Sequence, residues 1–263
     1  MRLALATALL CLGLHAPAPR AAAASVFLQE LSSADVREAL RGGQRTAIIP
    51  VGGVEQNGPH MALGKHNFRV HVQAGRIAAE LGNALVAPVV AYVPEGRVHP
   101  PTEHMRYAGT LSIPDEAFKG LLDGAARSLA QHGFTEIVFI GDSGNYQDQL
   151  QAVAAALNRR WKGGPARAHF IAAYYDSVQA PYARQLRERG LGDAQIGSHA
   201  GAADTALMLA VDPARVWPEK MAADAGGVHG DPRRATAELG RRGADLQVQQ
   251  TVAAIRKATA APR

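Results

Sequence analysis

Short apolar runs alternate with segments of helical periodicity, and this alternation limits the fold more than any other feature of the chain. Four runs have the length and β-branched content of buried strands: Thr46–Val51, Leu85–Val90, Glu136–Ile140 and Ala168–Ala172. The first expected helix covers 67–81, with Asn67 as its N-cap and Gly82 as its end. Further helices are expected over 114–131, between residue 145 and residue 161, and near 179–189, 201–210 and 241–258. Strands joined by helical crossovers pair in parallel, so the sequence predicts an α/β fold with a mainly parallel sheet and helices on both faces.

The first 24 residues have the pattern of a secretory signal peptide. A positive start at Arg2 precedes the apolar run Leu3–Leu14, and alanines fill 21–24. The run is shorter than the roughly 20 residues of a membrane-spanning helix. We therefore expect cleavage after Ala24, a periplasmic or secreted location, and one domain over 25–263.

Removal of the signal also removes Cys11, the one cysteine of the chain. A thiol nucleophile, a thiolate metal site and a disulfide are thereby excluded from the mature protein. The whole chain has a formal net charge of +5. Its basic residues are spread thinly and never mixed with aromatic residues in one block, so neither nucleic acid nor, after signal cleavage, a membrane is an expected partner.

Chemistry-bearing residues gather in five glycine-containing segments that follow strands or begin helices. These segments are Val51–His66, Thr102–Thr110, Gly141–Asn145, Gly197–Thr205 and Gly227–Gly240. In parallel sheets, functional residues lie beyond the carboxyl ends of the strands, where Glu55 and Asp142 are expected. Each segment alone has an ordinary explanation, since loop histidines are common at surfaces, and Asp142 and Asp204 could be helix caps.

Taken in order, the five segments resemble the motifs of the creatininase family of metal-dependent amidohydrolases. The similarity covers Pro50–Gly64 (PVGGVEQNGPHMALG), Thr102–Thr110 (TEHMRYAGT), Ile140–Asn145 (IGDSGN), His199–Ala206 (HAGAADTA) and Gly230–Gly240 (GDPRRATAELG). The resemblance implies a three-layer α/β/α sandwich, a two-metal site of zinc or manganese, hydrolysis of a non-peptide C–N bond in a small-molecule amide, and a homo-oligomer.

The departures from the family motifs lie at the positions of its metal ligands. Glu55 is retained, whereas Asn57 stands for a histidine, His66 for an aspartate, Asp142 for a histidine and Asp204 for a glutamate. Three carboxylates remain, so the resemblance implies a rearranged site that holds one or two divalent ions, zinc or manganese. Asn57 is the weakest ligand of the set, because an amide oxygen suits harder ions better than zinc.

The resemblance also implies the catalytic residues. His199 matches a motif histidine and is the candidate for proton transfer to the departing nitrogen. Glu103 and His104 are expected to line the pocket. His60 is expected to support the site, and His229 to face the same cleft. The expected substrate is creatinine or another small amide, such as a cyclic amide, lactam or imide.

Two other interpretations remain open. Ser143 follows a strand and precedes a helix, as the nucleophile of a serine hydrolase does, although GDSGN lacks the second glycine of that motif. Alternatively, the chain is a non-catalytic ligand-binding member of the family with a remodelled site.

Overall fold

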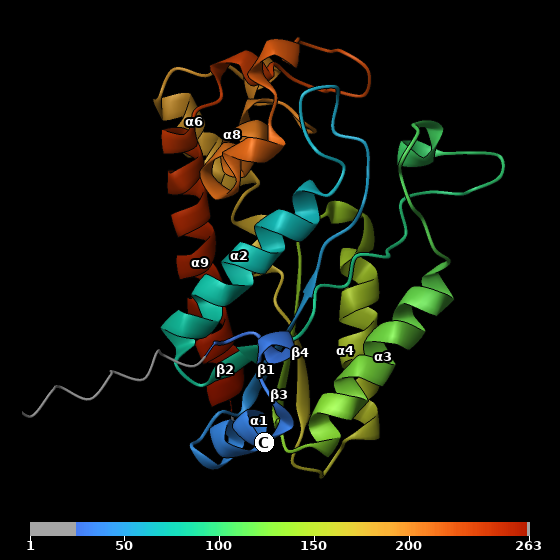
Figure 1. The fold of residues 1–263 in the computed structure, drawn as a ribbon, viewed down its shortest axis with the longest axis vertical. Coiled ribbons are helices and arrows are strands. Elements are labelled where there is room, and N and C mark those ends of the chain that lie inside the picture. The colour runs from blue at the N-terminus through green and yellow to red at the C-terminus, as the bar shows by residue number, and fades with distance from the viewer. Residues whose placement is uncertain (1–24, 262–263) are drawn as a thin grey trace, which may run out of the picture.

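The computed structural model describes residues 25–261, so the predicted signal peptide lies outside the described residues. A four-stranded parallel sheet with the order β2-β1-β3-β4 forms the centre of the fold (Figure 1). The strands are β1 (Thr46–Val51), β2 (Ala84–Val86), β3 (Glu136–Gly141) and β4 (Arg167–Phe170). The helices are α1 (Ser33–Arg41), α2 (Lys65–Leu81), α3 (Asp115–Gln131), α4 (Gln147–Arg160), α5 (Ala173–Asp176), α6 (Ala180–Glu188), α7 (Asp193–Ile196), α8 (Ala202–Val211) and α9 (Ala237–Ala260).

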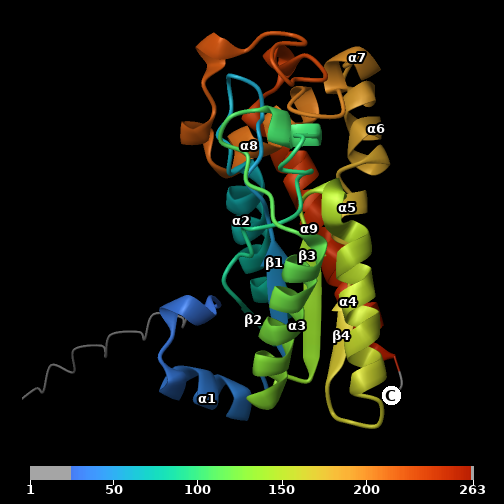
Figure 2. The same ribbon diagram turned by 90° about the vertical axis from the view of Figure 1, so that its right-hand side faces the viewer.

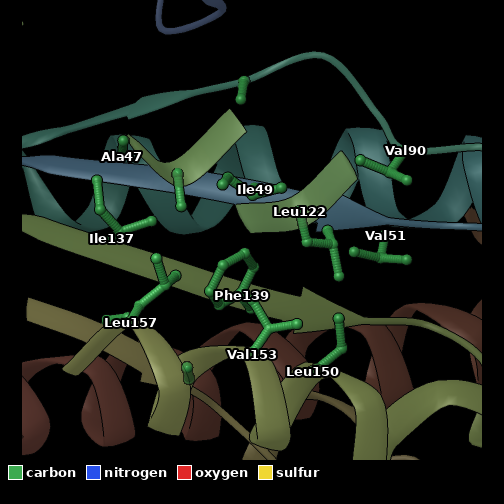
Figure 3. Close-up of a cluster of buried hydrophobic side chains, with 14 of the residues drawn as sticks. Ala47, Ile49, Val51, Val90, Leu122, Ile137, Phe139, Leu150, Val153 and Leu157 are labelled. Carbon is green, nitrogen blue, oxygen red and sulfur yellow. The ribbon is translucent and has the colours of Figure 1, made fainter. Parts of the chain in front are cut away.

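Helices cover both faces of the sheet, as the strand–helix alternation predicted. On one face, Ile48 and Val138 of the sheet pack with Val70 of α2 and Val252 of α9. On the other face, residues of β1 and β3 pack against α3 and α4 in the cluster of Figure 3, where Phe139 lies near Val153. The predicted three-layer α/β/α sandwich is therefore confirmed (Figures 1 and 2).

Several element boundaries differ from the predictions, among them those of β4, which ends at Phe170, and of α9, which begins at Ala237. The second strand is only Ala84–Val86, and Val90 contributes a single bridge to Val51. Helix α2 begins two residues earlier than expected, at Lys65, and Gly64 is its N-cap. The predicted capping role of Asn67 is wrong, because its side-chain oxygen accepts a hydrogen bond from the Gly53 N–H at 2.9 Å. Asn67 therefore holds the loop after β1 rather than the helix start.

The register of the sheet places the ends of β1 and β3 side by side. Val51 pairs with Gly141, and the Asp142 N–H donates to the Val51 carbonyl at 3.1 Å. Helices α6, α7 and α8 and the loops around them lie beyond this end of the sheet (Figure 1). Among residues 25–261, no helix has the length and apolar character required to cross a membrane.

Candidate functional site

A cavity of about 310 Å³ opens beyond the carboxyl ends of β1 and β3. Its lining includes seven of the eight site residues predicted from the sequence, which are Glu55, His66, Glu103, His104, Asp142, His199 and Asp204. Ser143 and His229 also line it. Four separate stretches of the chain therefore meet where the parallel topology predicted a site.

Six charged side chains form a closed chain of contacts at this cavity, which we call the ionic ring. Its members alternate in sign, and neighbours in the following order are in contact: Glu55, Lys65, Asp204, Arg69, Asp142 and His66. All six side chains except that of Asp204 are almost completely buried. Such burial of charges is tolerable only when each is paired.

Every carboxylate of the ionic ring contacts two cations. Asp204 accepts from Lys65 Nζ at 2.9 Å and from Arg69 Nη1 at 2.7 Å. Asp142 Oδ2 lies 2.9 Å from Arg69 Nη2 and 2.6 Å from His66 Nδ1. Glu55 Oε1 lies 2.8 Å from His66 Nε2 and 3.4 Å from Lys65 Nζ. The ring thus pairs three acids with three bases.

The electrostatics of the ring keep His66, Asp204 and Glu55 charged. Burial alone lowers the pKa of His66, but the charge of Glu55 and the hydrogen bonds to Asp142 and Glu55 outweigh it and raise that pKa to about 9. Burial raises the pKa of Asp204, yet the charges of Lys65 and Arg69 hold it well below its ordinary value. The pKa of Glu55 is likewise held well below normal, by His66 and Lys65 against the effect of burial.

The predicted five-residue ligand set does not fit a metal ion in this arrangement. Both nitrogens of His66 contact carboxylates, and both oxygens of Asp204 accept from cations. Tyr174 donates to the remaining oxygen of Asp142 at 3.0 Å. The side-chain nitrogen of Asn57 donates to the carbonyls of Glu55 and Ala62, and Asn57 is not among the residues lining the cavity. The ligand roles of these residues stay predictions that the geometry opposes.

A different group has the geometry for one ion. Glu55, His104 and His199 each offer a ligand atom, and these atoms lie within 4.8 Å of one another. Glu55 Oε2 lies 3.4 Å from His104 Nε2, and Glu55 Oε1 lies 3.7 Å from His199 Nδ1. A carboxylate with two imidazoles is a common donor set for zinc, manganese and iron. This group shares only Glu55 with the predicted ligands.

Gln56 orients both histidines of this group. The backbone carbonyl of Gln56 accepts from His199 Nε2 at 2.9 Å, which leaves Nδ1 of a neutral ring with its lone pair on the Glu55 side. The side-chain nitrogen of Gln56 lies 3.3 Å from His104 Nδ1. Burial lowers the pKa of His199 to about 3 and also lowers that of His104, so both rings are neutral at pH 7. Neutral imidazole is the form that binds metals.

The other predicted residues have more varied positions. Glu103 begins a short 3-10 helix (Glu103–Arg106) and lines the cavity, with an exposed side chain. His60 is buried, and its Nε2 lies 3.0 Å from Thr205 Oγ1, which agrees with the supporting role predicted for it. His229 pairs through its backbone with His199 and lines the cavity, as expected.

Ser143 lines the cavity as well, but its contacts are those of a cap. Its hydroxyl accepts from the Asn145 N–H at 3.4 Å. Within residues 25–261, no hydrogen bond joins this hydroxyl to a histidine or a carboxylate, so the structure shows no base to activate it.

Lys65 and Arg69 were missed by the sequence reasoning. Both lie in the first turns of α2, where the positive end of the helix dipole disfavours cations and where no acidic residue occurs. The signal that could have revealed them is a helix start with three bases, Lys65, His66 and Arg69, and no acid in its first turn.

Comparison with known proteins identifies the family. The family model described as creatininase, creatinine amidohydrolase, matches residues 29–255. The creatinine amidohydrolase of Pseudomonas putida is 28% identical over 194 residues, which cover 72% of this chain and 73% of that protein. The mycofactocin precursor peptide peptidase of Mycobacterium tuberculosis is 30% identical over 227 residues, or 74% of this chain and 78% of that protein.

Solved structures agree with this match. A manganese form of creatininase superposes with a TM-score of 0.73 at 25% identity, and the match covers 90% of this chain and 100% of that one. The matched relatives are hydrolases, which supports a hydrolase here. The family model spans nearly all of the described residues, and the chain therefore belongs to the creatininase family.

Proposed function

We propose that this chain is an exported hydrolase that cleaves a C–N bond of a small amide with the help of one divalent ion, zinc or manganese. The observation that carries the proposal is the convergence of Glu55, His104 and His199 on one point of the cavity. The names of the relatives support C–N hydrolysis, and the manganese form of creatininase supports a metal. The predicted signal peptide supports export.

Glu55, His104 and His199 would hold the ion in this proposal. When bound, a divalent ion supplies Lewis-acid polarisation of the carbonyl and activation of water. Gln56 fixes the ring of His199 through the hydrogen bond to its backbone carbonyl. The ionic ring fixes one oxygen of the Glu55 carboxylate. Glu55 Oε1 contacts His66 and Lys65, and Glu55 Oε2 faces His104.

In this arrangement we assign the proton-transfer role to Glu103. His199 has its Nε2 hydrogen-bonded to Gln56, so neither ring nitrogen is left for the proton-transfer role predicted from the sequence once Nδ1 holds an ion. Glu103 lines the cavity and is exposed, so its carboxyl can exchange protons with solvent and is the candidate for protonating the departing nitrogen.

The cavity favours a small, neutral substrate. Its volume of about 310 Å³ is at the lower end of ligand pockets. The carboxylates and cations of the ionic ring are paired with each other, so they leave no strong charge of one sign for an ionic substrate. Creatinine or another small cyclic amide, lactam or imide meets these conditions. We also propose a homo-oligomer, as the resemblance implied.

The test is hydrolysis of a panel of small amides by the exported protein, whose first residue after signal cleavage should be Ser25. We expect activity that a chelator abolishes and that Mn²⁺ or Zn²⁺ restores. Glu55→Gln and His199→Ala should each lower kcat/KM by more than about 100-fold, since removing even an outer partner of a metal ligand costs 10- to 100-fold. Glu103→Gln should lower kcat and leave metal content unchanged.

Ser143→Ala is the matched control, because Ser143 lines the same cavity. Its activity should stay within about threefold of the unmodified protein. Chelator-resistant activity that Ser143→Ala abolishes would instead establish the serine hydrolase. Tight binding of an amide without turnover would establish the non-catalytic binding protein.

A further inference from the structure

We infer that Lys65 and Arg69 replace metal ions in the ionic ring, so that the carboxylates at the positions of the family's metal ligands are neutralised by the chain's own cations. This inference goes beyond the proposed activity and does not depend on it. It concerns the two aspartates, Asp142 and Asp204, and the oxygen of Glu55 that faces them.

Each oxygen of the two aspartates already has a hydrogen-bond or ion-pair partner. Asp204 Oδ1 accepts from Arg69 at 2.7 Å, and Asp204 Oδ2 accepts from Lys65 and from the Ala200 N–H, both at 2.9 Å. Asp142 Oδ2 contacts Arg69 and His66, and Asp142 Oδ1 accepts from Tyr174. A divalent ion at either aspartate would have to displace, or bind beside, a guanidinium, an ammonium or the Tyr174 hydroxyl.

Displacement is opposed by burial. The side chains of Lys65 and Arg69 are only 1% and 4% exposed, so a displaced cation would lose its carboxylate partners in a buried setting. An ion that entered beside them would place like charges together in a medium of low dielectric constant, where their repulsion is strong. The ring is therefore a filled cation site rather than a vacant one.

Lys65 and Arg69 both come from the start of α2, and this explains how they can take the place of metal ions. Lys65 and Arg69 are one turn apart on α2, so their side chains lie on the same face of the helix. Arg69 bridges two acids that come from different elements, Asp142 after β3 and Asp204 in the first turn of α8. A planar guanidinium can serve two carboxylates at once, as a bridging metal ion does.

The experiment counts ions and measures stability on the mature protein, using Mn²⁺ and Zn²⁺ as probes. After equilibrium dialysis we expect at most one ion per chain, and none in His199→Ala, which disrupts the proposed three-residue group but leaves the ionic ring intact. Two ions per chain in the unmodified protein would overturn the inference. So would an ion retained by His199→Ala.

Stability gives a second readout that needs no activity. Lys65→Met and Arg69→Met should each lower the unfolding midpoint by at least about 6 °C, because each removes one of the two cationic partners of two ring carboxylates. Divalent ions should raise the midpoint of both variants by binding, in the folded state, the carboxylates that have lost a cationic partner. In His199→Ala, with the ring intact, they should have no such effect.

Conservative variants keep the test decisive if the methionine variants do not fold. Arg69→Lys retains the charge and should fold without added ions, and its midpoint should not respond to Mn²⁺ or Zn²⁺. A midpoint of Arg69→Lys or His199→Ala that rises with these ions would show that the ring itself binds metal. If the proposed hydrolase activity is absent and the unmodified protein binds no ion, the inference still stands on the methionine variants.

Discussion

Glu136 shows how a single carboxylate joins two strands far from the cavity. It lies at the start of β3 and contacts two residues of the edge strand β4, Arg167 at 3.1 Å and His169 at 2.6 Å. Burial raises its pKa, but the hydrogen bonds from His169 and Arg167 outweigh burial and lower that pKa below its ordinary value. The charged form therefore contributes to stability.

The sign of the shift predicts acid sensitivity. A carboxyl whose pKa is lowered on folding stabilises the protein above its unfolded pKa, about 4.3, and loses this contribution as pH falls through the folded value. At pH 7 we expect Glu136→Gln to lower the free energy of unfolding by about 1.5 to 3 kcal/mol. The difference in the free energy of unfolding between Glu136→Gln and the unmodified protein should narrow steadily below about pH 4.3. Urea titrations measure this difference. A difference that stays constant from pH 7 to pH 3 contradicts the prediction.

Glu95 is a residue whose importance only the structure reveals. It is completely buried, and burial together with the nearby charge of Glu55 raises its pKa to about 8. Asn145 donates to it at 2.6 Å. In the sequence, Glu95 is one acid in a loop, and nothing near it in the chain indicates that the fold will bury it beside a second carboxylate.

At the scale of elements, the close approach of α8 and α9 positions Asp204. A Cβ at Gly240, in the first turns of α9, would overlap the backbone carbonyl of Ala206 in α8. Because Asp204 lies two residues before Ala206 in α8, any separation of the two helices also displaces the ring's link to Lys65 and Arg69. Glycine is therefore required here for packing between helices.

Gly240→Ala should lower the free energy of unfolding by about 1 to 3 kcal/mol, the usual cost of overpacking. Gly120→Ala is the matched control in another helix, since a Cβ at Gly120 meets nothing within 4 Å. The control should leave stability unchanged or raise it by up to about 1 kcal/mol, because alanine favours helix. Equal effects of both substitutions in thermal unfolding would show that helix packing is not the cause.

Element boundaries show the limit of local patterns. Asn67 has the residue type of a helix cap, yet its carboxamide binds the loop after β1, and α2 begins with Lys65. Capping preference is a local property, whereas this contact joins residues 14 positions apart. The choice between the two partners depends on how β1 and α2 pack.

For the whole molecule, one exposed segment is the surface at which we propose that a second copy of the chain binds. The segment between β2 and α3 projects from the body of the fold (Figure 1) and carries four exposed large apolar side chains: Tyr92, Val98, Tyr107 and Leu111. Tyr92 is 58% exposed and Val98 is 64% exposed. Apolar side chains gathered on a projection favour burial against a second copy of the chain.

We expect the mature protein to be an oligomer by light scattering, and Tyr92→Asp with Val98→Asp to lower its mass toward that of a single chain. Leu121→Asp is the control, because Leu121 is 43% exposed but lies on α3. The mass of the Leu121→Asp protein should equal that of the unmodified oligomer. A monomeric unmodified protein, or an oligomer that survives the double substitution, would contradict this surface assignment.

The sequence by itself determined the layers of this protein and the set of segments that meet at the cavity. The layers and the positions of Glu55 and Asp142 follow from local chemistry, because apolar periodicity selects strands and helices, and parallel strands bring their carboxyl ends to one edge. The resemblance to the creatininase motifs implied that His199 and Asp204 join them, and all four residues line one cavity. Only the tertiary structure decided which charges pair. Lys65 and Arg69 enter the site because α2 begins at residue 65 and turns that face toward three acids from distant elements. Pairing of buried charges is a long-range outcome of packing, and no local pattern in the chain encodes it.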